Sequence, residues 1–302
     1  MRLHSLLALG TWLKRANYRF VTVTPETHRR VVARPPRRAR DLTDVFGWNL
    51  PFHYDVVTPE IMDLLRAGHL VEEDENGRCM SRVRFSSLEG GLYAHSPFPT
   101  EAIDSVFLGP DTYRFCRAIR QAALEPKVVV DIGCGSGAGG IVAGRNAKKV
   151  ILADINEKAL LFAEVNAQLN DARNVETVRS DLLAGVSDVP DLIVANPPYL
   201  LDPLARTYRD GGGAHGEGLA VRIVEESLRR LRRGGTLLLY TGVTMVRGED
   251  PFLRAVTPTL EAARAKVRYE EIDPDVFGEE LSLPAYAAAD RIALVLLEAT
   301  PS

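Results

Sequence analysis

The chain has 302 residues, of which 46% are hydrophobic and 25% charged, and its formal net charge is −3. This composition is typical of a globular protein with an ample core and argues against a disordered or fibrous chain. No apolar run approaches the ~20 residues of a membrane-spanning helix. Three scattered cysteines provide neither a disulfide framework nor a metal cluster, which favours a reducing compartment and a cytoplasmic location.

The first forty residues are strongly basic, with ten lysines and arginines and one acidic residue. The remainder of the chain holds 27 basic and 39 acidic residues. A basic segment can contact nucleic acid, an acidic partner or the acidic remainder of its own chain. Ser5–Leu13 is apolar but is followed by Lys14 and Arg15, so we expect a docked amphipathic helix rather than a cleaved leader. Its apolar face would consist of Leu3, Leu6, Leu7 and Leu13.

Residues 1–104 are predicted to form a smaller N-terminal α+β domain. Consecutive prolines disfavour a helix at Arg34–Arg38. A helix is expected to follow Thr58, with this residue as its N-cap and Pro59 in its first turn.

A hairpin is expected after this helix, formed by Met80–Ser86 and Gly91–His95. Helices followed by a two-stranded ribbon suggest a winged-helix-like arrangement. From this ribbon Arg82 and Arg84 could reach a phosphate, although many such domains bind proteins instead.

From residue 105 to 302 the pattern alternates between strands and helices. A helix at Tyr113–Ala122 precedes the first strand, and later helices are expected at Asn156–Asn170 and Gly218–Arg233. The expected strands are Val128–Gly133, Lys149–Ile155, Val175–Ser180, Asp191–Ala195, Gly235–Val243, Lys266–Ile272 and Arg291–Glu298. This alternation predicts an α/β fold with a doubly wound, mainly parallel seven-stranded sheet, whose ligand binds at the carboxyl ends of the strands.

The first strand leads into a glycine turn, Asp131-Ile132-Gly133-Cys134-Gly135-Ser136-Gly137. Glycine lets the backbone approach a ligand because no Cβ intervenes. Asp154 follows the second strand, 21 residues beyond Gly133, where a carboxylate can accept hydrogen bonds from two ribose hydroxyls. After the third strand, Asp181 could accept from an adenine amino group while Leu182 lies against the ring.

The most specific motif is Asn196-Pro197-Pro198-Tyr199, at the end of the fourth strand. The prolines fix the backbone there. The Asn196 side chain and the Pro197 carbonyl can both accept hydrogen bonds from one planar NH₂ group. Tyr199 offers an aromatic face on which a planar amide or base can stack. The motif therefore predicts a site that holds a flat amine.

Together these residues resemble the motifs of class I S-adenosylmethionine-dependent methyltransferases. Within that class the chain is similar to the release-factor glutamine methyltransferase (HemK-like) and "methyltransferase small domain" group. Phe162–Ala167 and the loop from Asp210 to Leu219 share this likeness, which covers residues 105–300. The resemblance implies a Rossmann-like seven-stranded sheet with an antiparallel last strand, and S-adenosylmethionine as cofactor with S-adenosylhomocysteine as product.

The resemblance also implies a role for each motif residue. The catalytic residues would be Asn196, Pro197, Pro198 and Tyr199. The cofactor would contact Asp131, Gly133, Cys134, Gly135, Gly137, Asp154, Ile155, Asp181, Leu182 and Asn196, and no metal is implied. The N-terminal domain does not resemble the helical recognition domain of the release-factor enzymes, so the acceptor stays open.

The predicted reaction is N-methylation of a planar amide or exocyclic amine, in a protein glutamine or a nucleic-acid base. The basic N-terminus favours a macromolecular acceptor over a small molecule, and no membrane partner is expected. One alternative is a small-molecule N-methyltransferase. Others are an NAD-dependent dehydrogenase, which would leave the asparagine–proline motif unexplained, and a non-catalytic binding protein.

Overall fold

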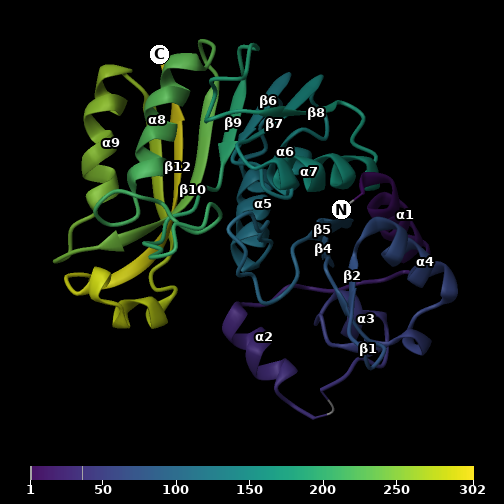
Figure 1. Ribbon diagram of the computed structural model, residues 1–302. Coiled ribbons are helices and arrows are strands. Elements are labelled where there is room, and N and C mark those ends of the chain that lie inside the picture. Colours follow the sequence, from purple (N-terminus) through teal and green to yellow (C-terminus); the bar gives the residue numbers. More distant parts are fainter. Residues whose placement is uncertain (1, 36) are drawn as a thin grey trace.

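The apolar runs after residue 105 form one sheet in a computed structural model of the chain, which describes residues 2–35 and 37–302 (Figure 1). Its order is β11-β12-β10-β9-β6-β7-β8. Only β12 runs antiparallel to its neighbours in this sheet. The predicted doubly wound sheet with an antiparallel last strand is therefore confirmed. The strands are β6 (Val128–Ile132), β7 (Lys149–Asp154), β8 (Val175–Arg179), β9 (Leu192–Ala195), β10 (Thr236–Met245), β11 (Lys266–Asp273) and β12 (Arg291–Thr300).

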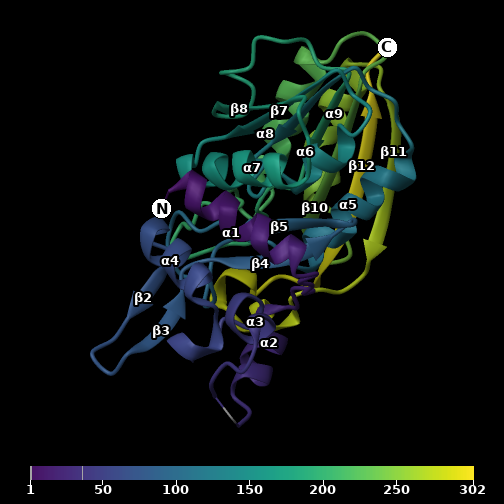
Figure 2. The same cartoon turned by 90° about the vertical axis from the view of Figure 1, so that its right-hand side faces the viewer.

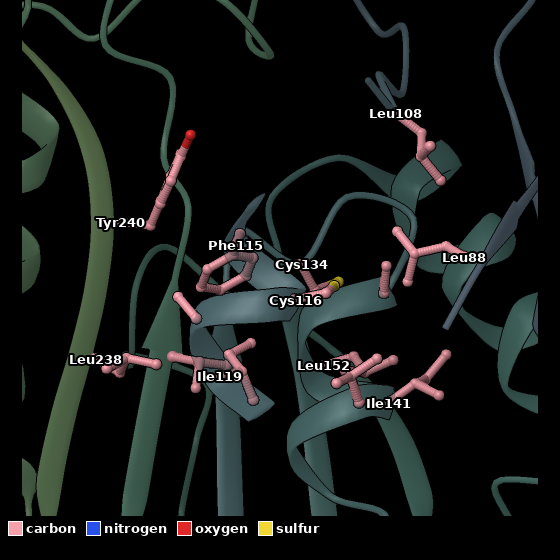
Figure 3. Packing of buried hydrophobic residues seen from close by; sticks show 14 of the residues in the cluster. Leu88, Leu108, Phe115, Cys116, Ile119, Cys134, Ile141, Leu152, Leu238 and Tyr240 are labelled. Atoms are coloured by element: carbon pink, nitrogen blue, oxygen red, sulfur yellow. The ribbon is translucent and has the colours of Figure 1, made fainter. Parts of the chain in front are cut away.

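Helices cover both faces of this sheet (Figure 1). One layer packs α5, α6 and α7 in a core with Phe115, Ile141 and Leu152, which Figure 3 shows. The other face is covered by α8 and α9, with Val224 and Phe252 in its core. The helices are α5 (Pro110–Ala122), α6 (Ala138–Ala143), α7 (Glu157–Leu169), α8 (Gly218–Arg230) and α9 (Pro251–Ala262).

The N-terminal segment begins with the expected docked helix. Leu6, Leu9 and Leu13 of α1 are fully buried, in a core that also contains Phe162 and Leu169 of α7. Figure 2 shows α1 lying beside α7. The elements of this segment are α1 (Leu3–Arg15), α2 (Pro25–Val32), α3 (Leu42–Phe46), β1 (Phe52–His53), α4 (Pro59–Gly68), β2 (Val71–Glu73), β3 (Arg78–Ser81), β4 (Arg84–Leu88) and β5 (Gly91–His95).

The helices of the N-terminal segment match the prediction at α4 and differ from it at α2. Helix α4 begins as expected, because the Thr58 hydroxyl accepts a hydrogen bond from the Ile61 N–H. Helix α2 was not predicted; it ends before the expected proline break, whose Pro36 lies outside the described residues. Three short 3₁₀ turns complete the chain, at Tyr54–Val56, Gly278–Ser282 and Pro284–Tyr286.

The ribbon of the N-terminal segment differs from the prediction. The stretch Met80–Ser86 is not one strand, because the Ser81 hydroxyl donates to the Val83 carbonyl and the chain turns there from β3 to β4. Strands β1, β3 and β2 form one antiparallel sheet, and β4 pairs with β5 in another. The hairpin that directly follows α4 is therefore β2–β3.

Arg84 does not lie on an exposed face of the ribbon, so the phosphate contact suggested for it stays a prediction. This side chain is buried, and its Nε donates to the Gly47 carbonyl. Arg82 is exposed but pairs with Glu72 on β2. The β2–β3 hairpin and the outer face of α4 are instead acidic, with exposed Glu60, Asp63, Glu72, Glu73, Asp74 and Glu75.

Two asparagines of α7 bind the backbone of β5, in addition to the apolar contacts that the two elements share. The Asn166 side chain accepts from the Ala94 N–H and donates to the Ala94 carbonyl, and it also donates to the Ser136 carbonyl. Asn170 makes the same pair of bonds with the backbone of Leu92. These side chains bind β5 as a neighbouring strand would, and Asn166 links it to the glycine turn. Within the described ranges, no helix has the length and apolar character needed to cross a membrane.

Candidate functional site

A cavity of about 600 Å³ lies where the carboxyl ends of β6, β7 and β9 face the N-terminal segment. Its walls come from distant parts of the chain. The sheet contributes the residues after the three strands, and the N-terminal segment contributes Thr22, His28 and Arg84. The loop containing Phe98 and the loop at residues 206–209 close it from other sides. The cavity therefore lies where a doubly wound sheet is expected to bind its ligand.

The glycine turn presents bare backbone to this cavity. Gly133 and Gly135 line it with φ of 65° and 53°, and a Cβ added to either would meet no atom within 4 Å. Gly137 also has positive φ, but a Cβ there would lie 2.9 Å from Leu152. The first two glycines therefore leave room for a ligand, whereas Gly137 leaves room for helix packing.

Asp131 and Cys134 lie behind the wall of the cavity, since both are buried and neither lines it. Asp131 Oδ2 accepts from the Gly140 N–H at 2.7 Å. Burial raises the pKa of Asp131 to about 7, against the lowering effect of that N–H. Burial also raises the pKa of the Cys134 thiol. These two residues support the turn from behind, and their predicted contact with the cofactor stays a prediction.

Asp154 projects from the end of β7 into the cavity. Its Oδ2 accepts from the Gly135 N–H and its Oδ1 from the Asn156 N–H, each at 2.9 Å. Burial raises the pKa of this carboxyl, while the N–H donors lower it. Each oxygen keeps a second lone pair, so the carboxylate can still accept from a vicinal diol. The exposed Ile155 borders the cavity beside it.

Asp181 and Leu182 line the cavity after β8. Leu182 is buried and adopts a φ of 49°. The Asp181 carboxylate is exposed and pairs with Arg222 of α8 at 3.2 Å. The ion pair with Arg222 therefore orients Asp181, the predicted acceptor for adenine. The spacing of the two residues in the sequence did not indicate this contact.

All four residues of the asparagine–proline motif line the cavity. Asn196 and Pro198 are half-buried, and Pro197 and Tyr199 are buried. Within the described residues, no hydrogen bond engages the Asn196 side chain or the Pro197 carbonyl. Both acceptors are therefore free to bind a ligand.

The Tyr199 ring is held firmly at the end of β9. Its hydroxyl donates to Asp111 Oδ2 at 2.6 Å, and a Cβ on Gly242 of β10 would lie 2.1 Å from its ring. Burial raises the pKa of Tyr199, and the neighbouring Asp111 carboxylate raises it further. The phenol is thus neutral and serves to position the motif.

Asp111 is a site residue that the sequence analysis did not identify. It lines the cavity at the start of α5, and its carboxylate also accepts from Tyr240 and from Arg114. The only local signal was its place in the helix start Gly109-Pro110-Asp111-Thr112. Its partners lie 3, 88 and 129 residues away, so their convergence was not readable from spacing.

The loop after Tyr199 closes the cavity against the N-terminal side. The Tyr208 hydroxyl donates to the Thr100 carbonyl at 2.5 Å, and Thr207 donates to the Ile103 carbonyl. Arg206 and Arg209 of this loop both pair with Asp202. His215 lies farther along the loop, and the cavity lining does not include it.

These features fit an S-adenosylmethionine molecule. The open space over Gly133 and Gly135 admits a ligand against the backbone, the free lone pairs of Asp154 suit a ribose, and Leu182 offers an apolar contact for a base. The nearby Asn196 and Pro197 acceptors lie in the same cavity.

Comparison with known proteins gives the same answer. The model of the family described as "Methyltransferase small domain" matches residues 115–269. The chain belongs to the methyltransferase small domain family. It is therefore a class I S-adenosylmethionine-dependent methyltransferase, and S-adenosylmethionine is its cofactor. This assignment removes the NAD-dependent dehydrogenase from the alternatives.

Some curated relatives of this methyltransferase carry glutamine in their names, and others are named ribosomal protein L11 methyltransferase. A provisionally named protein N5-glutamine methyltransferase of Methanocaldococcus jannaschii is 34% identical over 161 residues, which cover 49% of this chain and 80% of the relative. The release factor glutamine methyltransferase of Lactococcus lactis is 34% identical over 127 residues, 38% of this chain and 47% of that protein. The chain thus spans most of the first relative and about half of the second.

Among solved structures, Trm5b from Pyrococcus abyssi is similar with a TM-score of 0.53 and 17% identity, over 77% of this chain and 62% of that one. The tRNA m1G37 methyltransferase of M. jannaschii gives a TM-score of 0.51 and 18% identity, over 73% and 57%. At these identities the likeness supports the fold alone.

Proposed function

We propose that this methyltransferase methylates a planar NH₂ nitrogen held by Asn196 and Pro197, and that this nitrogen is the side-chain amide of a glutamine in a protein. The observation that carries the proposal is the pair of free acceptors at the end of β9. Asn196 and Pro197 line the same cavity as the residues expected to contact the cofactor, and within the described residues neither acceptor has a hydrogen-bond partner.

The chemistry follows from what these groups do to an amide. S-adenosylmethionine supplies a sulfonium-activated methyl group that a nitrogen takes by direct displacement. An amide nitrogen is a poor nucleophile because its lone pair is delocalised. By accepting both N–H bonds, Asn196 and Pro197 orient the nitrogen and stabilise the positive charge that develops on it. The nitrogen gains the methyl group and releases one proton.

Tyr199 and Asp111 act as positioning residues in this scheme. The 2.6 Å hydrogen bond between them ties the motif to the start of α5. Gly242 lets the Tyr199 ring lie flat against β10, since any side chain there would displace it. The two acceptors are thereby fixed before a substrate arrives, which is the condition for electrostatic catalysis.

Two observations support a protein as the acceptor. The names of the relatives refer to proteins as acceptors, and two of them specify glutamine. The exposed face formed by α4 and the β2–β3 hairpin carries six acidic side chains against three arginines, Arg66, Arg78 and Arg82, and this net negative charge disfavours the phosphates of a nucleic acid there. The three cysteines are buried free thiols, which agrees with a cytoplasmic setting for this reaction.

The second candidate is an exocyclic amine of a nucleic-acid base. One observation favours it: exposed arginines follow one another on α2 and the segment after it, and the first of them, Arg29, lines the cavity. These are Arg29, Arg30, Arg34, Arg37 and Arg38. The first two share Glu26 as an ion-pair partner, which reduces their net charge.

The test is to incubate the protein and a cell extract with methyl-labelled S-adenosylmethionine and to separate protein, RNA, DNA and small molecules. We expect label in the protein fraction. Asn196→Ala should lower the rate of transfer about 10²–10³-fold, the typical cost of one such donor or acceptor, and leave S-adenosylhomocysteine affinity within twofold. Label confined to nucleic acid or to small molecules, or full activity of Asn196→Ala, would reject the proposal.

A further inference from the structure

Arg84 is a buried cation on the wall of the cavity. Its side chain is 3% exposed, and it lines the cavity with Thr22 and His28. Nε donates to the Gly47 carbonyl at 2.8 Å, and Nη2 lies 3.4 Å from Nδ1 of His28. The guanidinium also lies 5.6 Å from the centre of the Phe20 ring. Each of these partners is uncharged.

His28 is neutral beside Arg84. Burial and, to a smaller extent, the nearby guanidinium lower the pKa of His28 to about 4. Nε2 of His28 bonds to the Trp48 carbonyl, so Nδ1 is the acceptor that faces Arg84. Burial also lowers the pKa of Arg84, to about 10, and the other ionisable groups that act on it are the phenols of Tyr18 and Tyr113.

The other cavity-lining arginines all have carboxylate partners. Arg29 pairs with Glu26, and Arg206 and Arg209 pair with Asp202. Within the part of the chain that the structure describes, no acidic side chain pairs with Arg84. Burying a charge without a counter-charge is costly, so such a site calls for an anion supplied by a ligand.

We propose that Arg84 binds a carboxylate of the methyl acceptor, at the end of the cavity formed by the N-terminal segment. This deepens the proposed function and rests on it, because it makes acidic character near the methylated nitrogen part of substrate recognition.

The charge around the cavity favours a carboxylate over a phosphate. Arg84 offers one positive charge, which one carboxylate neutralises. A phosphate dianion would remain undercompensated, and Glu26, Glu101 and Glu279 line the same cavity. The planar guanidinium also matches the geometry of a carboxylate.

The surroundings of Arg84 favour the acceptor over the cofactor as the source of this carboxylate. The methionine part of S-adenosylmethionine carries a carboxylate too. However, the groups in contact with Arg84 belong to Phe20, His28 and Gly47 of the N-terminal segment, whereas the proposed cofactor residues come from the sheet.

The first test uses acetate as the probe and the full chain. The melting temperature is measured over a series of sodium acetate concentrations, with sodium chloride keeping the ionic strength constant. We expect a saturable rise for the unaltered protein and for the control Arg82→Met, whose arginine is exposed and pairs with Glu72. Arg84→Met should weaken the apparent acetate affinity about 10- to 100-fold, as expected for a lost hydrogen bond to a charged group.

A second variant guards against misfolding. Arg84→Lys keeps the charge but loses the planar fork, so its acetate affinity should fall between those of the unaltered protein and Arg84→Met. An identical acetate response in Arg84→Lys, Arg84→Met and Arg82→Met would overturn the proposal, whatever the acceptor of the reaction is.

The second test assigns the carboxylate to its source. S-adenosylhomocysteine, which retains the methionine carboxylate, is titrated calorimetrically into the unaltered protein and the Arg84 variants. We expect its affinity to stay within twofold. A loss of tenfold or more would place the methionine carboxylate on Arg84 and overturn the assignment to the acceptor. Failure of the proposed function would appear separately, as label outside the protein fraction in the extract assay.

Discussion

A substitution at Gly135 tests where the cofactor binds. The added methyl group of an alanine there would project into the cavity without contacting any protein atom. The residue has a φ of 53°, and a Cβ would meet no atom within 4 Å. The left-handed backbone costs an L residue about 1–2 kcal/mol. With an unfolding entropy of about 2 cal/mol/K per residue, Gly135→Ala should lower the melting temperature by about 2–3 °C.

Gly135→Ala should also weaken cofactor binding, by more than its small effect on the melting temperature suggests. An extra methyl group against a closely packed ligand costs about 1–3 kcal/mol, so S-adenosylhomocysteine affinity should fall roughly 5- to 150-fold by calorimetry.

Gly77→Ala is the matched control, since Gly77 lies in the β2–β3 turn with a φ of 70° and open space around it. It should lose similar stability and keep full affinity. Equal affinities for the two variants would refute this reasoning.

Three further substitutions test other parts of the site. Asp154→Asn removes the charged acceptor for the ribose, so S-adenosylhomocysteine affinity should fall about 10-fold or more; an affinity within twofold of the original would contradict this role. Asn166→Ala removes three buried hydrogen bonds, including both to Ala94, and should cost about 3 kcal/mol in urea unfolding; a loss below about 1 kcal/mol would argue against the clamp. Burial raises the pKa of Asp131 to about 7 from 3.8, so the folded state binds its proton more tightly and stability should fall as pH rises from about 4 to about 7. Asp131→Asn should flatten this dependence, and an unchanged pH profile would contradict the assignment.

The methyltransferase sheet was predictable because its signals are local. Runs of β-branched residues marked the strands, and glycine, aspartate and asparagine marked the strand ends. The helix expected at Asn156–Asn170 shows how far this reasoning reaches: α7 begins directly after Asn156, whose side chain caps it by accepting from the Lys158 N–H. The division of the chain at residue 104 stays a prediction, since the N-terminal segment shares a core with α7.

The rest of the site depends on contacts between distant residues. Asp111 gains its role from Tyr199 and Tyr240, which approach it only in the folded sheet. Arg84 was predicted to lie on the surface of a ribbon together with Arg82. The sequence pattern of the ribbon does not show which of the two side chains other parts of the chain cover. Arg84 is buried beside His28 of α2, whose ring stacks on Phe98. These contacts join distant parts of the chain, so no local pattern predicts them.

We propose that Asn196 and Pro197 present a glutamine amide to the methyl donor. The most direct test of this proposal is to supply S-adenosylmethionine with a deuterated methyl group and to locate the label by tandem mass spectrometry of peptides from the modified extract. We expect the deuterated methyl on a glutamine side-chain nitrogen, and its absence when Asn196→Ala replaces the unaltered protein. Label on a nucleic-acid base, or on any atom other than that amide nitrogen, would contradict it.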